Sequence, residues 1–353
     1  MSKRNIKAIN MLIKKERIPI KQIALTGLLP SFLKKIFYRL KGYKIGTNVS
    51  IGLGSVIIGK NVHINDNTKI GFLSVIRANE INIERFVRIG SMVYIDTEKV
   101  FIDDDACINE NVIIAGIKFP DSLLHLGKRT VIMEYSFINP TKPIEIGDDS
   151  GIGGHCLLFT HGSWLSQLDG YPVTFAPITI GKNVWLPWRV FIMPGVTIGD
   201  NVVIGANSLV TKSVPCNCLI AGSPAKIISD NYPSPITEER RIGIFDNIIS
   251  NFNEYLAYNG FTTEQKVNHD GFVINVSKRN IASSLIYSKT GNTNEPCNKD
   301  SVIIFDNANA NSSYRNYKMI VNLRNKTRIG TSLIGEEFVS YLSRYGLRFE
   351  RLD

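Results

Sequence analysis

The sequence lacks any long apolar run. No stretch of its 353 residues approaches the roughly 18 consecutive apolar residues that a membrane-spanning helix needs. The N-terminal stretch also lacks the apolar core and the small-residue cleavage site of a secretory signal, since it reads MSKRNIKAINMLIKKERIPIKQ. The sequence therefore predicts a protein that stays in the cytoplasm.

Cysteine is scarce and shows no pairing pattern. The five cysteines are Cys107, Cys156, Cys216, Cys218 and Cys297. Their number is odd, none has the CxxC spacing of zinc ligands, and Cys216 and Cys218 are too close together for such a site. We therefore expect reduced thiols that pack as small hydrophobic groups, with neither a disulfide framework nor a metal site.

Acidic residues are nearly absent from residues 1–44. This segment holds twelve Lys or Arg and one acid, Glu16, whereas the other 309 residues hold 29 basic and 30 acidic side chains. Nucleic-acid-binding domains usually carry their positive charge on the folded body, beside aromatic residues or a known motif. No such motif is present, so we expect no nucleic-acid partner and interpret residues 1–44 as a separate basic helical segment.

From residue 45 onward the sequence has a six-residue repeat. In its clearest stretch every sixth residue is aliphatic: Ile180, Leu186, Ile192, Ile198, Ile204 and Val210. A glycine follows three of these residues, at positions 181, 199 and 205. A helix would show an apolar spacing of 3.6 and an isolated strand a spacing of two. Neither element explains a period of six.

A coil of short, flat strands does explain this period. Each strand would point one aliphatic residue inward, and Gly, Asn and Asp would take the corners, where the backbone reaches positive φ. Stacked coils of this kind bury a continuous aliphatic column. The sequence thus predicts a mainly β protein with a parallel β-helix over residues 45–229. Breaks in the repeat predict two extruded loops, at 115–130 and 162–177.

Residues 230–353 follow a different pattern, which predicts a small α/β domain. Segments 237–261 and 335–345 have helical patterns. Short β-rich runs lie at 271–276, 284–288, 302–306, 319–323 and 347–352.

The segment SFLKKIFYRLKG (31–42) has an amphipathic helical pattern. Phe32, Ile36, Phe37 and Leu40 share one side, and Lys34, Lys35, Arg39 and Lys41 lie largely on the other. One interpretation is a helix that caps the open end of the β-coil. Another is an interfacial helix that contacts anionic lipid or a polyanionic glycan, with the protein peripheral at the inner face of the membrane. The two interpretations are compatible.

The stretch 153–228 resembles the hexapeptide-repeat acetyltransferases, the family of maltose, galactoside and polysaccharide O-acetyltransferases. The similarity is carried by GGHCLLFTHGSW, by FAPITIGKNVWLPWRVFIMPGVTIGDNVVIGANSLVTKSVP and by the ending AGSPAKII. The resemblance implies a left-handed parallel β-helix, a homotrimer, acetyl-CoA as co-substrate and active sites in clefts between subunits. It does not extend over 230–353.

The resemblance also implies a general base, His161 in the sequence FTHG. In the family a histidine at the start of the extruded loop has this role. An acceptor hydroxyl must lose its proton as it attacks the thioester, and an imidazole that titrates near neutrality can take that proton. His155, six residues earlier, is a weaker candidate for substrate contact. His63, His125 and His269 have no motif around them.

The family pattern assigns further candidates for the binding of coenzyme A and sugar. The coenzyme A candidates are Trp185, Ala206, Asn207, Thr211, Lys212 and Lys226. Basic groups suit the phosphates of coenzyme A. The sugar candidates are Trp164 in the extruded loop, His155, Trp188 and Arg189. Pro187, Trp188 and Arg189 replace the small residues that the family usually has, so the groove should differ in shape. Trp188 could stack on a sugar ring or fill a subunit interface.

These features predict an O-acetyltransferase that acts on a sugar hydroxyl of a capsule or lipopolysaccharide chain by direct transfer. One alternative is an N-acetyltransferase that acts on an amino sugar or a nucleotide sugar. Another is an enzyme similar to the γ-type carbonic anhydrases, in which His125, His155 and His161 would have to bind zinc. A third is a β-helix scaffold without catalytic activity.

Overall fold

The computed structural model describes residues 18–279, 281–289, 300–306 and 317–353. The chain divides into two compact units, Met1–Pro233 and Ser234–Asp353. Cys297 and most of the predicted basic segment's N-terminal half lie outside the described residues.

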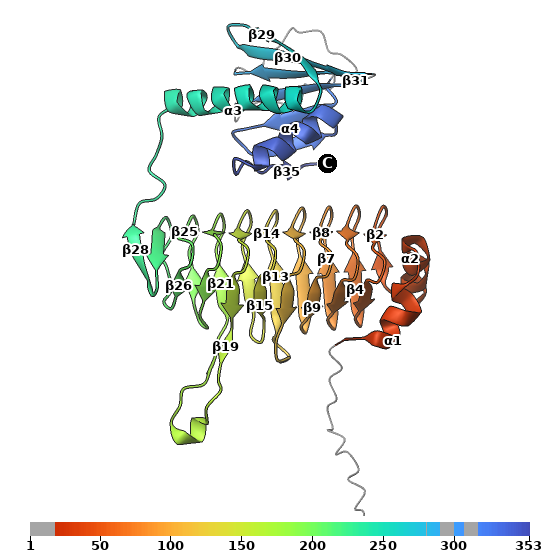
Figure 1. Ribbon diagram of the computed structural model, residues 1–353, viewed down its shortest axis with the longest axis vertical. Coiled ribbons are helices and arrows are strands. Elements are labelled where there is room, and N and C mark those ends of the chain that lie inside the picture. The colour runs from red at the N-terminus through yellow and green to blue at the C-terminus, as the bar shows by residue number, and fades with distance from the viewer. Residues whose placement is uncertain (1–17, 280, 290–299, 307–316) are drawn as a thin grey trace, which may run out of the picture. The chain divides into compact units, whose positions relative to one another are not determined.

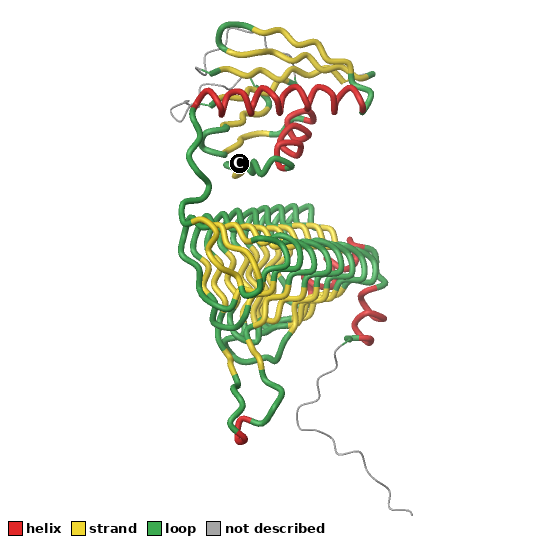
Figure 2. Tube along the Cα trace, turned by 60° about the vertical axis from the view of Figure 1, so that its left-hand side comes forward, coloured by secondary structure: helices red, strands yellow, loops and turns green. Residues whose placement is uncertain are grey.

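The first unit is a stack of coils whose short strands form three faces (Figures 1 and 2). Face A contains β1 (Lys44–Ile45), β4 (Asn61–Ile64), β7 (Glu80–Ile83), β10 (Lys99–Ile102), β13 (Leu123–Leu126), β16 (Ile144–Ile146), β21 (Ile178–Ile180) and β24 (Thr197–Ile198). Face B contains β2 (Ser50–Ile51), β5 (Lys69–Ile70), β8 (Arg88–Ile89), β11 (Cys107–Ile108), β14 (Val131–Ile132), β17 (Gly151–Ile152), β22 (Trp185–Leu186), β25 (Val203–Ile204), β27 (Leu219–Gly222) and β28 (Ala225–Ser229). Face C contains β3 (Val56–Ile58), β6 (Val75–Arg77), β9 (Tyr94–Asp96), β12 (Ile113–Ala115), β15 (Phe137–Asn139), β18 (Leu157–Phe159), β23 (Phe191–Ile192) and β26 (Leu209–Val210).

The strands pair in parallel, each with the strand one coil away, except that β28 pairs antiparallel with β27. Lys44 pairs with His63 and Lys69 with Arg88, so the early coils take 19 residues, whereas Thr179 pairs with Thr197, so a later coil takes 18. The aliphatic positions of the repeat point inward and are buried, including Ile180, Leu186 and Ile192. Burying each such side chain contributes roughly 1.5–3 kcal/mol. The predicted left-handed β-helix fold class is therefore confirmed.

Three rows of turns connect the faces, and we call them the A/B, B/C and C/A corners. The turn residues on the A/B and B/C corners repeatedly have positive φ, as at Asn183 on the first and His155 on the second. At the C/A corner the chain leaves the coil twice. The second departure holds β19 (His161–Gly162), the 3₁₀ turn Gln167–Asp169 and β20 (Thr174–Phe175), and it projects from the stack (Figure 1). The predicted loop at 162–177 is confirmed, because the coil resumes with β21 at Ile178.

The predicted loop at 115–130 is wrong over more than half of its length. β13 pairs in parallel with β10 and β16 and continues face A. Leu124 and Leu126 are fully buried in the coil. The chain leaves the coil only between Gly116 and Ser122. The run LLHLG keeps the alternation of a strand, but the preceding insertion shifts it out of the six-residue register.

A helical segment closes the first coil, and its polar side makes the contact. It comprises α1 (Ile20–Gln22), the π-helical turn Ile23–Gly27 and α2 (Ser31–Leu40), beside β2 in Figure 1. The ammonium of Lys34 is fully buried and donates to the carbonyl oxygens of Gly52 (2.5 Å) and Ser55 (3.1 Å). The hydroxyl of Tyr38 accepts from the N–H of Ile57 at 2.9 Å.

The sequence pattern divides this helix into an apolar and a basic side, and the structure shows which of them meets the coil. Lys34, on the basic side, is buried, and burial lowers the pKa of its ammonium. The apolar residues Phe32, Ile36 and Leu40 are exposed. The first coil has no coil beneath it, so its carbonyl and N–H groups need polar partners, and the polar side of α2 supplies them.

The second unit is a seven-stranded sheet with two helices. The strands follow chain order: β29 (Thr262–Val267), β30 (Gly271–Lys278), β31 (Ile281–Ser288), β32 (Ser301–Phe305), β33 (Met319–Asn322), β34 (Thr327–Gly330) and β35 (Glu350–Arg351). Both α3 (Glu238–Tyr258) and α4 (Leu333–Ser343) share one core with the sheet, where Phe252 packs on Phe338 at 5.1 Å between ring centroids. The predicted α/β class of this region is confirmed, but β29 and β34 were missed because their sequences, TTEQKV and TRIG, contain few apolar residues. No described helix is both long and apolar enough to span a membrane.

Candidate active site

His161 lies at the C/A corner, where β18 ends and the extruded loop begins. Thr160 fixes this point, because its buried hydroxyl donates to the carbonyl of Asn139 (2.7 Å) and accepts from the N–H of Lys142 (2.9 Å). β19 then pairs antiparallel with β20, which places His161 opposite Phe175. The base of the loop is thus held by the coil, and the imidazole is only partly buried.

A hydrogen-bonded chain from the preceding coil orients the imidazole. The buried hydroxyl of Thr141 donates to Oδ1 of Asn139 at 2.6 Å. Its oxygen can then accept from Nδ1 of His161, which lies 3.4 Å away. It also accepts from the N–H of Ile117 at 3.0 Å. This arrangement favours the tautomer that carries its proton on Nδ1, which leaves the lone pair of Nε2 to act as a base.

Aromatic rings and one cation surround this imidazole. Phe175 stacks on His161, with 5.7 Å between ring centroids and 13° between planes. Phe119, from the shorter excursion, meets Phe175 edge-on at 5.7 Å. The Lys142 ammonium lies 4.7 Å over the Phe119 ring and is paired with Asp121 at 2.9 Å. Both excursions of the C/A corner therefore meet at the histidine.

A buried carboxylate ties the shorter excursion to face C. Asp96 at the end of β9 contacts Arg77 at 2.6 Å and Lys118 at 2.7 Å. Burial alone would raise the pKa of Asp96, but hydrogen bonds from the two cations outweigh it and lower the pKa to about 2. Lys118 is thus held by a charge that persists at neutral pH.

Three of the four sugar candidates, His155, Trp188 and Arg189, share the B/C corner with two of the coenzyme A candidates. His155 stacks on Tyr135 at 5.1 Å, and Trp188 lies 5.8 Å from His155. The Trp188 ring covers Gly154, where an added Cβ would meet it at 2.3 Å. Arg189 follows at this turn, and Ala206 and Asn207 form the next one, all exposed. These rings form an exposed aromatic row along one edge of the coil.

The remaining candidates lie elsewhere. Trp185 is on face B, with its ring over Gly151, where an added Cβ would meet it at 2.7 Å. Thr211 and Lys212 are exposed at the C/A corner, beyond the coil that carries His161, and Lys226 is exposed on β28. Trp164, at 96% exposure, lies in the extruded loop.

The structure therefore separates the candidates within one chain. His161 and the pair Ala206–Asn207 lie at opposite ends of face C. The chain from His155 to His161 crosses that face, and at about 3.3 Å per residue the two corners are about 15–20 Å apart. Within one chain the proposed base does not meet the proposed pantetheine corner.

A zinc site from the three histidines does not form within the chain. His125 lies on face A and contacts Asp103 at 3.2 Å, whereas His155 and His161 occupy different corners. Among the described residues no three His, Cys, Asp or Glu side chains converge as metal ligands would. Burial also raises the pKa of the Cys156 thiol, beside His155, to about 11, so this thiol is a poor nucleophile.

Sequence reasoning missed Asn139, Thr141, Phe119 and Phe175. The only signal was spacing. Asn139 and Thr141 follow an inward Ile138 one coil before Leu158, so an alignment of coils would have placed them beneath His161. That alignment requires a coil of 20 residues, from Ile138 to Leu158, whereas a strict six-residue period gives a coil of 18.

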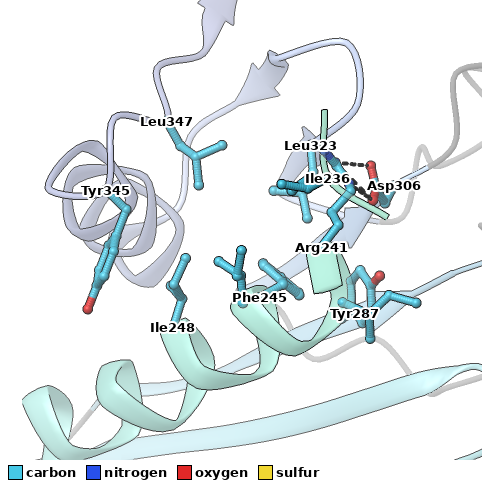
Figure 3. Close-up of a pocket in the computed structure, with 11 residues that line it drawn as sticks. Ile236, Arg241, Phe245, Ile248, Tyr287, Asp306, Leu323, Tyr345 and Leu347 are labelled. Carbon is cyan, nitrogen blue, oxygen red and sulfur yellow. Dashed lines mark hydrogen bonds and ion pairs between the residues drawn. The ribbon is translucent and has the colours of Figure 1, made fainter. Parts of the chain in front are cut away.

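The second unit has a cavity of its own, of about 290 Å³. Figure 3 shows its mainly apolar lining, including Phe245 and Ile248 of α3 together with Leu347. The polar end holds Arg241, whose guanidinium contacts Asp306 at 2.8 Å. This ion pair is internally satisfied, and the cavity presents no general base to a ligand.

Comparison with known proteins finds relatives that are named acetyltransferases. The family model described as "Bacterial transferase hexapeptide (six repeats)" matches residues 177–212. Galactoside O-acetyltransferase of Escherichia coli (strain K12) is 59% identical over 119 residues, covering 31% of this chain and 55% of that protein. The acetyltransferase WcaF of the same strain, named for colanic acid biosynthesis, is 34% identical over 124 residues, covering 30% of this chain and 68% of that protein.

One similar solved structure is the hexapeptide-repeat acetyltransferase VCA0836 of Vibrio cholerae O1 biovar eltor, crystallised with acetyl coenzyme A. It has a TM-score of 0.26 and 21% identity, and the match covers 59% of this chain and 83% of that one. The similarity to WcaF extends over two thirds of that protein. On this relative the chain belongs to the hexapeptide-repeat acetyltransferases. This confirms the predicted family, and the chain spans only about half the length of the galactoside O-acetyltransferase.

Proposed function

We propose that this chain transfers an acetyl group from acetyl-CoA to a sugar hydroxyl of a surface polysaccharide, either capsule or lipopolysaccharide. The observation that carries the proposal is the series of hydrogen bonds from Asn139 through Thr141 to His161, which orients the imidazole at the base of the extruded loop. The name of WcaF, which refers to the biosynthesis of colanic acid, supports a polysaccharide as acceptor.

The proposed reaction is a direct transfer. Nε2 of His161 takes the proton of the acceptor hydroxyl while that oxygen attacks the thioester carbonyl. The C–S bond then breaks, and the coenzyme A sulfur leaves with the proton returned from the imidazolium. General-base catalysis of this kind contributes roughly 10²- to 10⁴-fold in rate. A covalent enzyme intermediate is unnecessary because the thioester is already activated.

The proposed assembly is a homotrimer. One chain places His161 and the Ala206–Asn207 turn on different corners, about 15–20 Å apart. A neighbouring copy that brings its B/C corner to the C/A corner of the first would join base, donor and the aromatic row with Trp188. Light scattering on the purified chain should give three times the 39.4 kDa chain mass. A monomer at micromolar concentration would contradict the shared site.

The acceptor is tested by following the release of free coenzyme A with a panel of glycans. Anionic polysaccharides and lipopolysaccharide fragments should support turnover, and the product should carry an ester that mild alkali removes. Amino sugars and nucleotide sugars serve as the matched comparison. An alkali-stable amide as the only product would identify an N-acetyltransferase instead.

A further inference from the structure

The helical segment at the start of the coil, residues 18–40, exposes large apolar side chains, eight of which we call the apolar strip. Its members are Ile18, Ile20, Leu25, Leu28, Phe32, Ile36, Phe37 and Leu40. Their exposed fractions range from 43% at Phe37 to 83% at Leu40. An exposed patch of this kind, formed by a helix rather than by scattered residues, indicates a surface that contacts something else.

The apolar strip is not needed to close the coil. The opposite side of α2 does that through Ser31, Lys34 and Tyr38, which hydrogen-bond to Ile51, Gly52, Ser55 and Ile57. The polar side chains of α2 thus contact the first coil, and its apolar side chains face outward. This is the reverse of an ordinary surface helix, in which the apolar stripe faces the core.

A groove opens beside the apolar strip. It has a volume of about 260 Å³ and lies between the π-helical turn and α2. Leu25, Phe37 and Ile57 line it, together with the exposed Lys41. The lining also includes Gln22, Thr26 and Tyr38, and the Lys41 ammonium donates to the Tyr43 hydroxyl at 2.7 Å. A partly apolar groove with a cation at its edge suits an acyl chain and its anionic headgroup.

We propose that the apolar strip docks on the surface of an anionic lipid membrane. The positive charge around the apolar strip favours an anionic membrane over other binding partners. Residues 18–44 contain Lys21, Lys35 and Lys44 among their cations and no Asp or Glu. A second copy of the chain would bring the same positive segment and be repelled. A soluble polyanion would match the charge but leave the apolar residues in water, whereas an anionic bilayer matches both.

The test uses the full chain and sedimentation with vesicles of phosphatidylcholine alone or mixed with phosphatidylglycerol. The wild-type chain should bind the mixed vesicles, and binding should weaken as salt rises. The triple variant F32Q/I36Q/L40Q should bind at least ten-fold more weakly. Its melting temperature should stay within a few degrees of wild type, because these side chains are exposed.

Two further variants define the outcome. I227Q/I228Q removes exposed apolar residues from the other end of the coil and should bind like wild type. K21Q/K35Q/K44Q should lose most of its binding to the anionic vesicles.

The proposal is wrong if the wild-type chain does not sediment with mixed vesicles, or if only the lysine variant loses binding. It is also wrong if F32Q/I36Q/L40Q changes the oligomeric mass and leaves vesicle binding intact, because the occupant would then be a second copy. Acetyl transfer to a soluble glycan is a separate readout, which tests the proposed function independently.

Discussion

The A/B and C/A corners of the same coil use their polar residues in opposite ways. At the A/B corner the asparagines Asn183, Asn201 and Asn217 form a ladder, with side-chain amides donating from coil to coil at 2.9 and 3.0 Å. At the C/A corner Thr141 links Asn139 to the imidazole of His161, and no described residue hydrogen-bonds Nε2 of that ring. Where the repeat is regular, polar groups satisfy one another. Where the chain leaves the coil, the imidazole of His161 is held with the lone pair of Nε2 free.

The largest effect is expected from removal of the His161 imidazole, which tests whether the C/A corner is catalytic where the A/B corner is structural. H161A should lower kcat by roughly 10²- to 10⁴-fold, because the acceptor hydroxyl loses its general base. Affinity for acetyl-CoA and the melting temperature should hardly change, since the ring is only partly buried. Steady-state kinetics measures kcat, and calorimetry measures the affinity for acetyl-CoA and the melting temperature. H63A, on the exposed side of face A, is the matched control. Retention of more than about a tenth of wild-type kcat would assign the base to another residue.

The sequence predicted these two corners unequally. The aliphatic series from Ile180 to Val210 predicts the coil, because its six-residue period leaves one buried position per strand. The FTHG motif placed His161 at the loop. Its partner Thr141 was not predictable, because Ile138 pairs with Leu158, 20 residues later, whereas a strict six-residue period gives coils of 18 residues. The direction of α2 also escaped prediction, since periodicity shows two faces but not which of them the open coil needs, as Lys34 demonstrates.

The second prediction concerns the charge that holds the shorter excursion. A carboxyl with a folded-state pKa of about 2, below its ordinary value near 3.9, stabilises the fold above pH 4 and loses that contribution as pH falls towards 2. D96N should therefore lose about 2 kcal/mol of unfolding free energy at pH 7. The difference from wild type should shrink between pH 4 and pH 2. Chemical denaturation across this range measures it.

At the A/B corner Asp149 offers the comparison for that variant. It pairs with Arg129 at 2.7 Å but is partly exposed, so D149N should cost less than about 1 kcal/mol. Equal losses in the two variants would mean that the Asp96 cluster is an ordinary surface ion pair.

The third prediction separates positioning from catalysis. T141V removes the hydroxyl that receives the Nδ1 proton of His161, so the imidazole loses its orientation but keeps its chemistry. We expect kcat to fall about tenfold, equivalent to about 1.4 kcal/mol, with little change in the KM for acetyl-CoA. T141S retains the hydroxyl and should restore most of the rate. If T141S and T141V are equally slow, Thr141 acts through packing and not through its hydrogen bond.

The smallest expected effect lies at the A/B corner and tests whether its ladder is purely structural. Asn201 has a φ of 57° and donates to Asn217 at 3.0 Å. N201A replaces Asn, which tolerates the left-handed region, by Ala, which does not, and it also loses the ladder contacts with Asn183 and Asn217, so it should cost about 1–2 kcal/mol. N201G removes the same contacts but accepts this φ without strain, and should cost only about half as much. The difference between the two variants measures the strain, and the loss that remains in N201G measures the ladder. Both variants should acetylate at the wild-type rate, because this corner contributes nothing to the proposed site. A fall in kcat without loss of stability in either variant would show that the two corners do not divide structure and chemistry between them.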